Sequence, residues 1–329
     1  MRASGENSEA APQSATNGVG FNSVPQARAS SAGPAHASSS RPAPATCVLA
    51  GTVPYPLLSS RARGWAGLTV ELHSFQQLDA VVQPADHVIS VHLAGDVNLQ
   101  RTRNGRTKVR KMAAGDVVIT PAGAPVRWAQ SSQSLVILLR LAPAYIQGIA
   151  GDEGAIDPDR FNLRDVFATR DTTLEDVARR LLAALELEGA DSLLHVDTLT
   201  TELAIHLLRS YTTTGVREWP KSRLSPHKLR RAIEFIDENL DRQVTLAALA
   251  EVVSLSPGHF AHAFREATGV APHRYVIEQR VDRAKVLLRQ SDLPITEIAD
   301  RIGCSSHSHF SVLFHRVTGL TPRQYRALD

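Results

Sequence analysis

The sequence predicts a multidomain α+β protein: a small antiparallel β-barrel followed by two helices, and then an all-α domain that contains a duplicated pair of helices. Two observations lead to this fold class. Short runs of strand-forming residues, separated by Gly, Pro, Asn and Asp, lie between residues 46 and 142, and a seventeen-residue frame occurs twice after residue 258. The length of 329 residues also exceeds that of a usual single domain.

The composition restricts the class of protein. Apolar residues make up 43% of the chain and charged residues 21%, as in ordinary soluble proteins. The longest apolar stretch, LVILLRLA from Leu135, contains Arg140 and is too short to span a bilayer. The N-terminus lacks the apolar core of a secretory signal, and two cysteines, Cys47 and Cys304, are too few for a disulfide framework or a four-cysteine zinc site. We therefore expect a cytoplasmic protein without a membrane segment, a metal or a cofactor.

The chain is expected to begin with a disordered leader, residues 1–45. This segment is rich in Ala, Ser, Pro, Gly and Asn, and Phe21 is its only aromatic residue. It therefore buries too little apolar area to offset the entropy lost on ordering.

Residues 46–145 are expected to form the β-barrel. Strand-type runs occur at 68–75, 87–93, 108–112, 116–120 and 134–141, with Gly, Pro, Asn or Asp between them. The tripeptide at 104–106, Asn-Gly-Arg, predicts a hairpin turn. Such a series of short strands favours a compact antiparallel sheet or barrel.

Residues 146–211 are expected to be helical. Two stretches carry apolar residues at helical spacing: Leu174, Val177, Ala178, Leu181, Leu182 and Leu185 in the first, and Leu199, Leu203, His206, Leu207 and Ser210 in the second. The two faces either cover the protein's own sheet or form a dimer interface. Residues 212–225 are expected to be a linker, and Ser225 followed by Pro226 predicts the first turn of the last domain, residues 226–329.

The duplicated frame lies in this last domain. Residues 259–275 (HFAHAFREATGVAPHRY) and 309–325 (HFSVLFHRVTGLTPRQY) share seven identities: His259, Phe260, Phe264, Thr268, Gly269, Pro272 and Tyr275 recur as His309, Phe310, Phe314, Thr318, Gly319, Pro322 and Tyr325. A short amphipathic segment, 246–253 or 295–302, and a tight connection precede each copy. Two short helices that share a small core across such a turn are typical of a helix-turn-helix unit.

The spacing of the two units indicates binding to DNA. In such a unit the second helix lies in the major groove, with its N-terminal part toward the base edges. A helix expected at about 272–290 joins the units and would span about 27 Å, which approaches the ~34 Å between successive turns of the groove. The local charge is also mildly basic: residues 221–329 hold sixteen Lys and Arg against twelve Asp and Glu, while the whole chain has a net charge of only +3.

At these residues the sequence resembles a known family. The stretch 228–328, centred on the two copies of the frame, is similar to the DNA-binding domain of AraC/XylS-type transcription regulators. The resemblance implies a seven-helix domain that binds asymmetric promoter DNA, RNA polymerase as a further partner, and an N-terminal effector or dimerisation domain. The family's usual Gly-Phe pair is Gly303-Cys304 here, and His262 and Val312 stand where the family often carries arginine.

Base-reading and phosphate-binding residues can be named within the two units. Base edges are expected to be read by Gly258, His259, Ala261, His262 and Arg265 in the first unit, and by His307, Ser308, Ser311, Val312 and His315 in the second. Phosphate contacts are expected from Arg280, Arg283, Arg316 and Arg323, and from helix amides capped by Ser256 and Ser306. For each side chain the alternative is an ordinary exposed polar residue, and for His259 and His309 it is partial burial. Cys304 is expected to fill a gap in the core rather than to act as a redox sensor.

The predicted barrel carries a weaker motif. Gly115, Pro121, Gly123 and Val126 match the spacing of the second motif of cupin barrels, with valine at the position of a metal-ligand histidine. This resemblance predicts a cupin-like barrel without a metal, which either binds a small molecule or is purely structural.

The strand at 87–93 is the candidate wall of a pocket. His87 and His92 are an odd number of residues apart, so they lie on opposite faces of a strand and at most one points inward. The candidate effector-pocket residues are His87, Ile89, Val91, Arg127 and Trp128. Alternation alone does not say which face is inward, and for Arg127 the alternative is a surface arginine.

Together these features predict a sequence-specific, DNA-binding transcription regulator rather than an enzyme, with double-stranded promoter DNA as its partner. A small-molecule effector in the barrel and a homodimer are further expectations, and both activation and repression stay open. The alternative is a cupin-type barrel enzyme with a DNA-binding appendage, which would need several converging imidazoles or carboxylates. A DNA-repair protein with a similar helix pair would need a metal-held cysteine cluster, which Cys47 and Cys304 do not supply.

Overall fold

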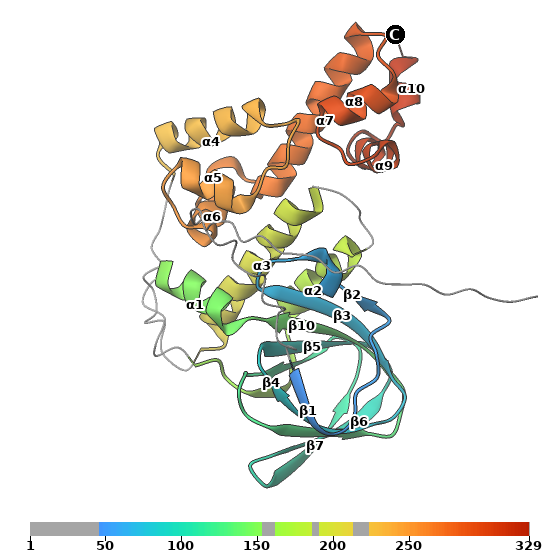
Figure 1. The fold of residues 1–329 in the computed structure, drawn as a ribbon, viewed down its shortest axis with the longest axis vertical. Helices are drawn as coiled ribbons and strands as arrows, with labels where there is room; N and C mark the ends of the chain where they lie inside the picture. Colours follow the sequence, from blue (N-terminus) through green and yellow to red (C-terminus); the bar gives the residue numbers. More distant parts are fainter. Residues whose placement is uncertain (1–45, 153–161, 186–190, 213–223, 329) are drawn as a thin grey trace, which may run out of the picture. The chain divides into compact units, whose positions relative to one another are not determined.

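The computed structural model describes residues 46–152, 162–185, 191–212 and 224–328. Strands dominate the N-terminal part of the described chain and helices the C-terminal part (Figure 1). The predicted disordered leader, 1–45, and residues 213–223 of the predicted linker lie outside the described residues. Among the helices that are described, none is long and apolar enough to cross a membrane.

Two antiparallel sheets form the N-terminal part, which we call the β domain. The first sheet has the order β1 (Thr46–Thr52), β4 (Leu78–Pro84), β9 (Val126–Gln130), β6 (Val97–Arg103) and β7 (Arg106–Met112). The second has the order β11 (Val166–Arg170), β8 (Asp116–Thr120), β5 (His87–Ala94), β10 (Ser134–Leu141), β3 (Leu68–Phe75) and β2 (Leu58–Ser59). A short 3₁₀ helix, η1 (Arg61–Arg63), separates β2 from β3. The predicted antiparallel β structure is confirmed, and closure into a barrel stays a prediction.

The strands with the strongest apolar runs were located well from the sequence. β3, β8 and β10 have the predicted bounds, and β5 and β7 are one or two residues longer than predicted. The predicted hairpin joins β6 to β7, where Arg103 pairs with Arg106. Its two central residues, Asn104 and Gly105, both have positive φ, at 51° and 71°, which is the geometry of the type I′ turn that suits the twist of a hairpin.

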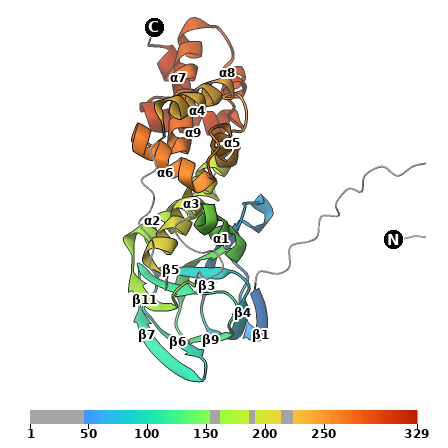
Figure 2. The ribbon, with the colours of Figure 1, turned by 90° about the vertical axis from the view of Figure 1, so that its left-hand side faces the viewer.

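Three helices cover one face of the second sheet: α1 (Pro143–Asp152), α2 (Thr172–Ala184) and α3 (Asp191–Ser210), as Figures 1 and 2 show. The inward faces of α2 and α3 pack in one apolar cluster with the outer faces of β5 and β10. Of the two alternatives for these apolar faces, the structure therefore shows packing on the protein's own sheet. The segment is not helical throughout, because Val166–Arg170 forms β11 at the sheet edge.

The described residues 224–328 form an all-α domain. Its helices are α4 (Pro226–Glu238), α5 (Leu246–Val252), α6 (Pro257–Thr268), α7 (Pro272–Gln290), α8 (Ile295–Arg301), α9 (His307–Thr318) and α10 (Pro322–Arg326). Ser225 caps α4 by accepting a hydrogen bond from the amide of Lys228, as the Ser-Pro pair predicted. The long helix α7 contributes Val276 to the apolar cluster of the first helix pair, and Val281 and Ala284 to that of the second.

Candidate nucleic-acid interface

The repeated residues build the same small core twice. In the first unit, formed by α5 and α6, the ring of Phe264 lies edge-on to that of Tyr275, with centroids 5.4 Å apart. In the second, formed by α8 and α9, Phe314 and Tyr325 repeat this contact at 5.3 Å. The paired phenylalanines are fully buried in both units. The identities shared by the two copies therefore specify the frame of each unit.

The ends of the two recognition helices are also built alike. Ser256 and Ser306 each accept a hydrogen bond from the amide three residues later, at 3.3 and 3.1 Å, which confirms both as N-caps. At the other end Gly269 and Gly319 adopt left-handed φ angles of 80° and 77°, and their amides bond to carbonyls four residues back at 2.8 Å. The frame thus fixes where each recognition helix begins and ends.

The predicted base-reading face of α9 lies on the accessible surface. His307, Ser308, Val312 and His315 are exposed, and Ser311 is half-buried. Val312 is an apolar residue at an exposed position, with 55% of its surface accessible. These five side chains are at least partly accessible, so they could contact a partner.

The corresponding face of α6 is less accessible than predicted. Arg265 is exposed, and His259 and His262 are half-buried. Gly258 and Ala261 are buried, so the prediction that they read base edges does not fit this structure. Their burial has a packing cause: Ala261 belongs to the same apolar cluster as Leu194 of α3.

Arg265 and His262, on this face, both interact with neighbouring charged groups. The Nη1 atom of Arg265 lies 3.7 Å from the carboxylate of Glu202 in α3. Burial, together with the charges of Arg209 and Arg265, lowers the pKa of His262, although Glu266 acts in the opposite sense. His262 is therefore neutral near pH 7, with one ring nitrogen that donates and one that accepts.

Arg280 is not a phosphate ligand, contrary to the prediction. Its side chain is 1% exposed, and Nε donates to the carbonyl oxygen of Leu240 at 3.0 Å while Nη2 donates to that of Arg242 at 2.6 Å. Both carbonyls follow α4, so Arg280 ties the loop after α4 to the middle of α7. The helical period places Arg280 and Arg283 one turn apart, but it does not reveal that only the second reaches solvent.

The other predicted phosphate ligands are accessible. Arg283, Arg316 and Arg323 are exposed, and the N-cap residue Ser306 is exposed as well, while Ser256 is half-buried. These positions could meet a nucleic-acid backbone without rearrangement.

Cys304 is a buried core residue. It is 5% exposed, and burial raises the pKa of its thiol to about 11. The thiol therefore stays protonated and unreactive near neutral pH. This agrees with the prediction of a residue that fills the core.

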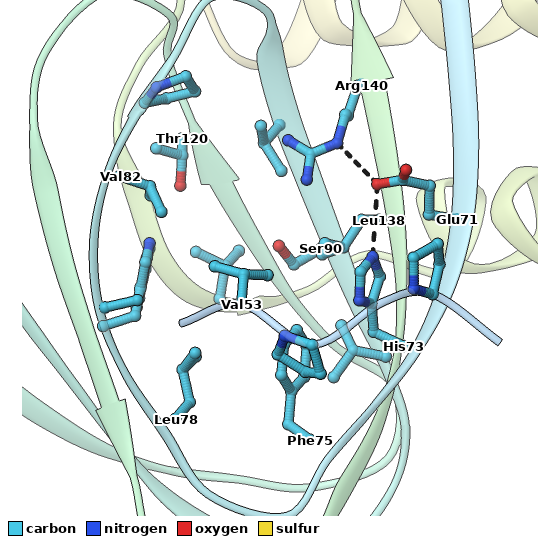
Figure 3. A pocket seen from close by; sticks show the side chains of 18 of the residues that line it. Val53, Glu71, His73, Phe75, Leu78, Val82, Ser90, Thr120, Leu138 and Arg140 are labelled. Carbon is cyan, nitrogen blue, oxygen red and sulfur yellow. Dashed lines mark hydrogen bonds and ion pairs between the residues drawn. The ribbon is translucent and has the colours of Figure 1, made fainter. Parts of the chain in front are cut away.

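The β domain contains a cavity of about 620 Å³ that is partly open to solvent (Figure 3). The β5 side chains that line it are Val88, Ser90 and His92. Ile89 and Val91 point to the opposite face of the sheet, where they pack beneath the helices. The predicted pocket residues of β5 therefore lie on the wrong face, which alternation alone could not decide.

The remaining predicted pocket residues divide as follows. Trp128 lines the cavity. Arg127 is an exposed residue that forms a bidentate pair with Asp79, at 2.7 and 2.6 Å. His87 does not line the cavity, and its Nδ1 accepts a hydrogen bond from the amide of Ala122 at 3.2 Å.

A buried ion-pair cluster at one end of the cavity was missed by the sequence analysis. The carboxylate of Glu71 on β3 accepts from Nε of Arg61 at 2.8 Å and from Nε of Arg140 on β10 at 2.9 Å, and its Oε2 lies 3.3 Å from Nε2 of His73 (Figure 3). Burial opposes ionisation of Glu71, but the hydrogen bond from His73 and the charges of the two arginines hold its pKa at about 2. The available signal was a single Asp, Glu, Lys or Arg within each of two strands, Glu71 in the first and Arg140 in the second.

One residue of the cupin-type motif, Val126, lines this cavity. Val126, at the position of the metal-ligand histidine, is buried and lines the cavity wall. Gly115 has a left-handed φ of 85° at the turn before β8. Among the described residues, no three His, Cys, Asp or Glu side chains are grouped as they would be around a metal ion.

Comparisons with known proteins concern mainly the C-terminal domain. Residues 249–328 match a family model described as a helix-turn-helix domain. The arabinose operon regulatory protein of Escherichia coli (strain K12) is 30% identical over 128 residues, which cover 38% of this chain and 44% of that protein. The HTH-type transcriptional activator RhaS of Salmonella schwarzengrund (strain CVM19633) is 32% identical over 152 residues, or 45% of this chain and 52% of that protein.

Solved structures are also similar to part of this chain. The C-terminal domain of AraT, a response regulator from Geobacillus stearothermophilus, is 33% identical, and the match covers 33% of this chain and 89% of that chain, with a TM-score of 0.31. This chain matches about half the length of the two curated relatives. Both relatives are named as regulators rather than as enzymes.

Proposed function

We propose that this chain, whose residues 249–328 form a helix-turn-helix domain of the AraC/XylS type, is a sequence-specific regulator of transcription that binds double-stranded promoter DNA. One observation carries the proposal. The two units share the residues that build their frame and differ at the residues that their recognition helices expose. Such a pattern keeps the orientation of each recognition helix in the major groove and changes the bases that each helix contacts.

The joining helix supports the use of both units on one DNA molecule. α7 contains 19 residues, which at about 1.5 Å per residue corresponds to about 28 Å. Two recognition helices at its ends would enter major-groove turns that lie ~34 Å apart on one face of the duplex. One chain would then read an asymmetric site over two successive turns of the groove, whereas dimeric helix-turn-helix proteins need two chains to contact two such turns.

The base-reading roles are proposed for the accessible residues of each unit. In α9 these are His307, Ser308, Ser311, Val312 and His315, and in α6 they are His259, His262 and Arg265. Hydroxyl and imidazole groups can bond to base edges, and the exposed methyl groups of Val312 suit the methyl group of thymine. Arg283, Arg316 and Arg323, with the amides capped by Ser256 and Ser306, would hold the phosphates.

The β domain is proposed to regulate this activity by binding a small-molecule effector in a cupin-like barrel. The cavity supports this, because its volume of about 620 Å³ is in the usual range for ligand sites. A homodimer, contact with RNA polymerase and a cytoplasmic location are parts of the same proposal.

Transcription in a purified system tests the regulatory role. The template carries a promoter next to a site selected from random DNA by the purified full chain, and the control template carries a scrambled site. We expect the amount of transcript to change several-fold on the first template alone, in either direction, and the double variant Ser308→Glu, Ser311→Glu to lose the effect. Tight binding to the selected site without any change in transcript would contradict a regulatory role.

A further inference from the structure

The cavity of the β domain is mostly apolar. The inference about its ligand rests on the proposed function, in which the β domain binds an effector. Of the 27 residues that line it, 18 are aliphatic, aromatic or proline, 4 are uncharged polar residues and 5 are charged or histidine. A sugar needs hydrogen-bonding partners around most of its surface, because each buried hydroxyl without a partner is costly. This wall therefore favours a ligand with a large apolar body.

The charged side chains that line the cavity gather at one end, and their charges cancel. Glu71 is ionised and bonds to both Arg61 and Arg140. Asp86 lies close enough to feel the charges of the same two arginines. The two cations thus interact with two acidic groups, and Arg61 is also largely exposed, with 56% of its side chain accessible. This end provides no excess of positive charge that would favour a carboxylate or phosphate ligand.

His73 has an unsatisfied nitrogen at this end. Its side chain is 3% exposed, its ring lines the cavity, and its ring stacks parallel to that of Phe75 with centroids 5.2 Å apart (Figure 3). An ionised carboxylate only accepts hydrogen bonds, so Nε2 of His73 must carry the proton that it donates to Glu71. In the neutral ring Nδ1 is then an acceptor, and no described residue donates to it.

Such an acceptor is rarely left unpaired in a folded protein. The charged groups at this end, Glu71 and Arg140, are hydrogen-bonded to each other. Ser90 projects into the cavity from β5, two strands away from His73 in the same sheet (Figure 3). A donor from a bound molecule would satisfy Nδ1, and the carboxylate behind the ring would strengthen it as an acceptor, as in other carboxylate–histidine pairs.

We infer that the β domain binds an uncharged, predominantly apolar molecule that carries a hydroxyl group, an alcohol or a phenol, and that this hydroxyl donates a hydrogen bond to Nδ1 of His73. The apolar body lies along the aliphatic wall, and Phe75 and Trp128 provide aromatic faces for it.

Four probes that differ in one property each test this inference by isothermal titration of the full chain. They are 4-butylphenol, 4-butylanisole, in which a methyl ether replaces the donor hydroxyl, 4-butylbenzoate, which carries a charge, and L-arabinose, which is polar throughout. We expect 4-butylphenol to bind about tenfold more tightly than 4-butylanisole, which is the usual contribution of one hydrogen bond. 4-Butylbenzoate and L-arabinose should bind more weakly than both.

Variants locate the binding and identify the acceptor. In His73→Phe the preference for the phenol over the anisole should disappear while the anisole still binds, which also shows that the variant is folded. His73→Asn, whose amide oxygen lies near the place of Nδ1, should restore part of the preference. Ser90→Phe, which fills the cavity, should abolish binding of both probes.

Several outcomes would overturn the inference, and they separate it from the proposed function. Tighter binding of 4-butylbenzoate or L-arabinose would show a ligand site of another chemical class. Binding of 4-butylphenol that is unchanged in Ser90→Phe would place the site elsewhere, and an unchanged preference in His73→Phe would remove the role of Nδ1. Absence of binding by all four probes would refute the proposed class of ligand. The proposed role as a transcription regulator is tested separately, by DNA binding.

Discussion

Replacing Arg280 should damage the stability of the helix-turn-helix domain and leave the electrostatics of DNA binding unchanged. The guanidinium is buried between α7 and the loop after α4, and it donates to two carbonyl oxygens, those of Leu240 and Arg242. A hydrogen bond from a charged group contributes about 1.5 to 3 kcal/mol, so two contribute about 3 to 6 kcal/mol. Removing the cost of burying the cation offsets part of this, which leaves a net loss of about 3 kcal/mol for Arg280→Ala.

Amide hydrogen exchange of the full chain measures this loss within the domain itself. A loss of about 3 kcal/mol corresponds to about 150-fold faster exchange at the slowest amides of α4 and α7. Arg280→Lys keeps the charge but loses the planar fork that reaches both carbonyls, and we expect an intermediate effect. Arg283→Ala is the matched control, because Arg283 is exposed on the same helix and its loss should leave exchange unchanged.

DNA binding by the same variants completes the test. Arg283→Ala should weaken binding to all sequences and reduce the slope of log K against log salt by about 1, as loss of one phosphate contact does. Arg280→Lys, measured where it is fully folded, should keep the slope of the unmodified protein. An unchanged exchange rate combined with a reduced salt slope in the Arg280 variants would refute the structural role assigned to this residue.

Three further predictions concern His262, Gly303 and the two buried histidines of β5. His262→Ala should reduce the affinity for DNA by about 1 to 3 kcal/mol when the site carries the base that His262 reads, and by little when that base has been replaced. Binding to a set of DNA sites that differ at single base pairs measures this, and a uniform loss on all sites would contradict base reading. Gly303→Ala should destabilise the helix-turn-helix domain by at least about 2 kcal/mol. Gly303 has a φ of 73°, and an added Cβ would lie 2.5 Å from the carbonyl oxygen of Leu240. An unchanged midpoint of urea unfolding would contradict this close approach. Burial lowers the pKa of both His87 and His92 to about 4. Between pH 6.5 and 4 the unfolded chain therefore binds protons that the folded β domain does not. The free energy of unfolding should fall as the pH decreases through this window, by up to about 3 kcal/mol for each histidine. Urea unfolding at pH 7 and pH 5 checks this, and His92→Gln should show a smaller decrease.

The C-terminal domain could be predicted closely because its frame is local in sequence. Apolar residues at helical spacing, serine caps and glycines after the helices all act within a few residues, so the bounds of α7 and the caps of α6 and α9 followed from the pattern. The sequence of a helix does not reveal which of its polar residues faces inward, because that depends on backbone groups far away in the sequence. Arg280 is buried because the carbonyls after α4 accept from it, and those carbonyls carry no side-chain signal.

The β domain was harder to predict because its polar residues pair across strands. Arg101 on β6 is buried, with Nη1 2.6 Å from the carboxylate of Asp165 and its guanidinium over the ring of Phe167. Charged residues in such positions break the apolar alternation, and β6 was missed for that reason. Glu71 and Arg140 likewise meet only through the pairing of β3 with β10, which places Glu71 opposite Leu138. The partner strands and the inward face of β5 are tertiary properties.

Selection of bound sequences from random duplex DNA by the full chain, at near-physiological salt, tests the central claim most directly. The account predicts one asymmetric motif with two elements about one helical turn apart, and it predicts that changes in α9, such as Val312→Asn, alter only one of the two elements. Enrichment of a single short element, or a change in both elements when α9 alone is altered, would contradict the claim that one chain reads DNA with two recognition helices.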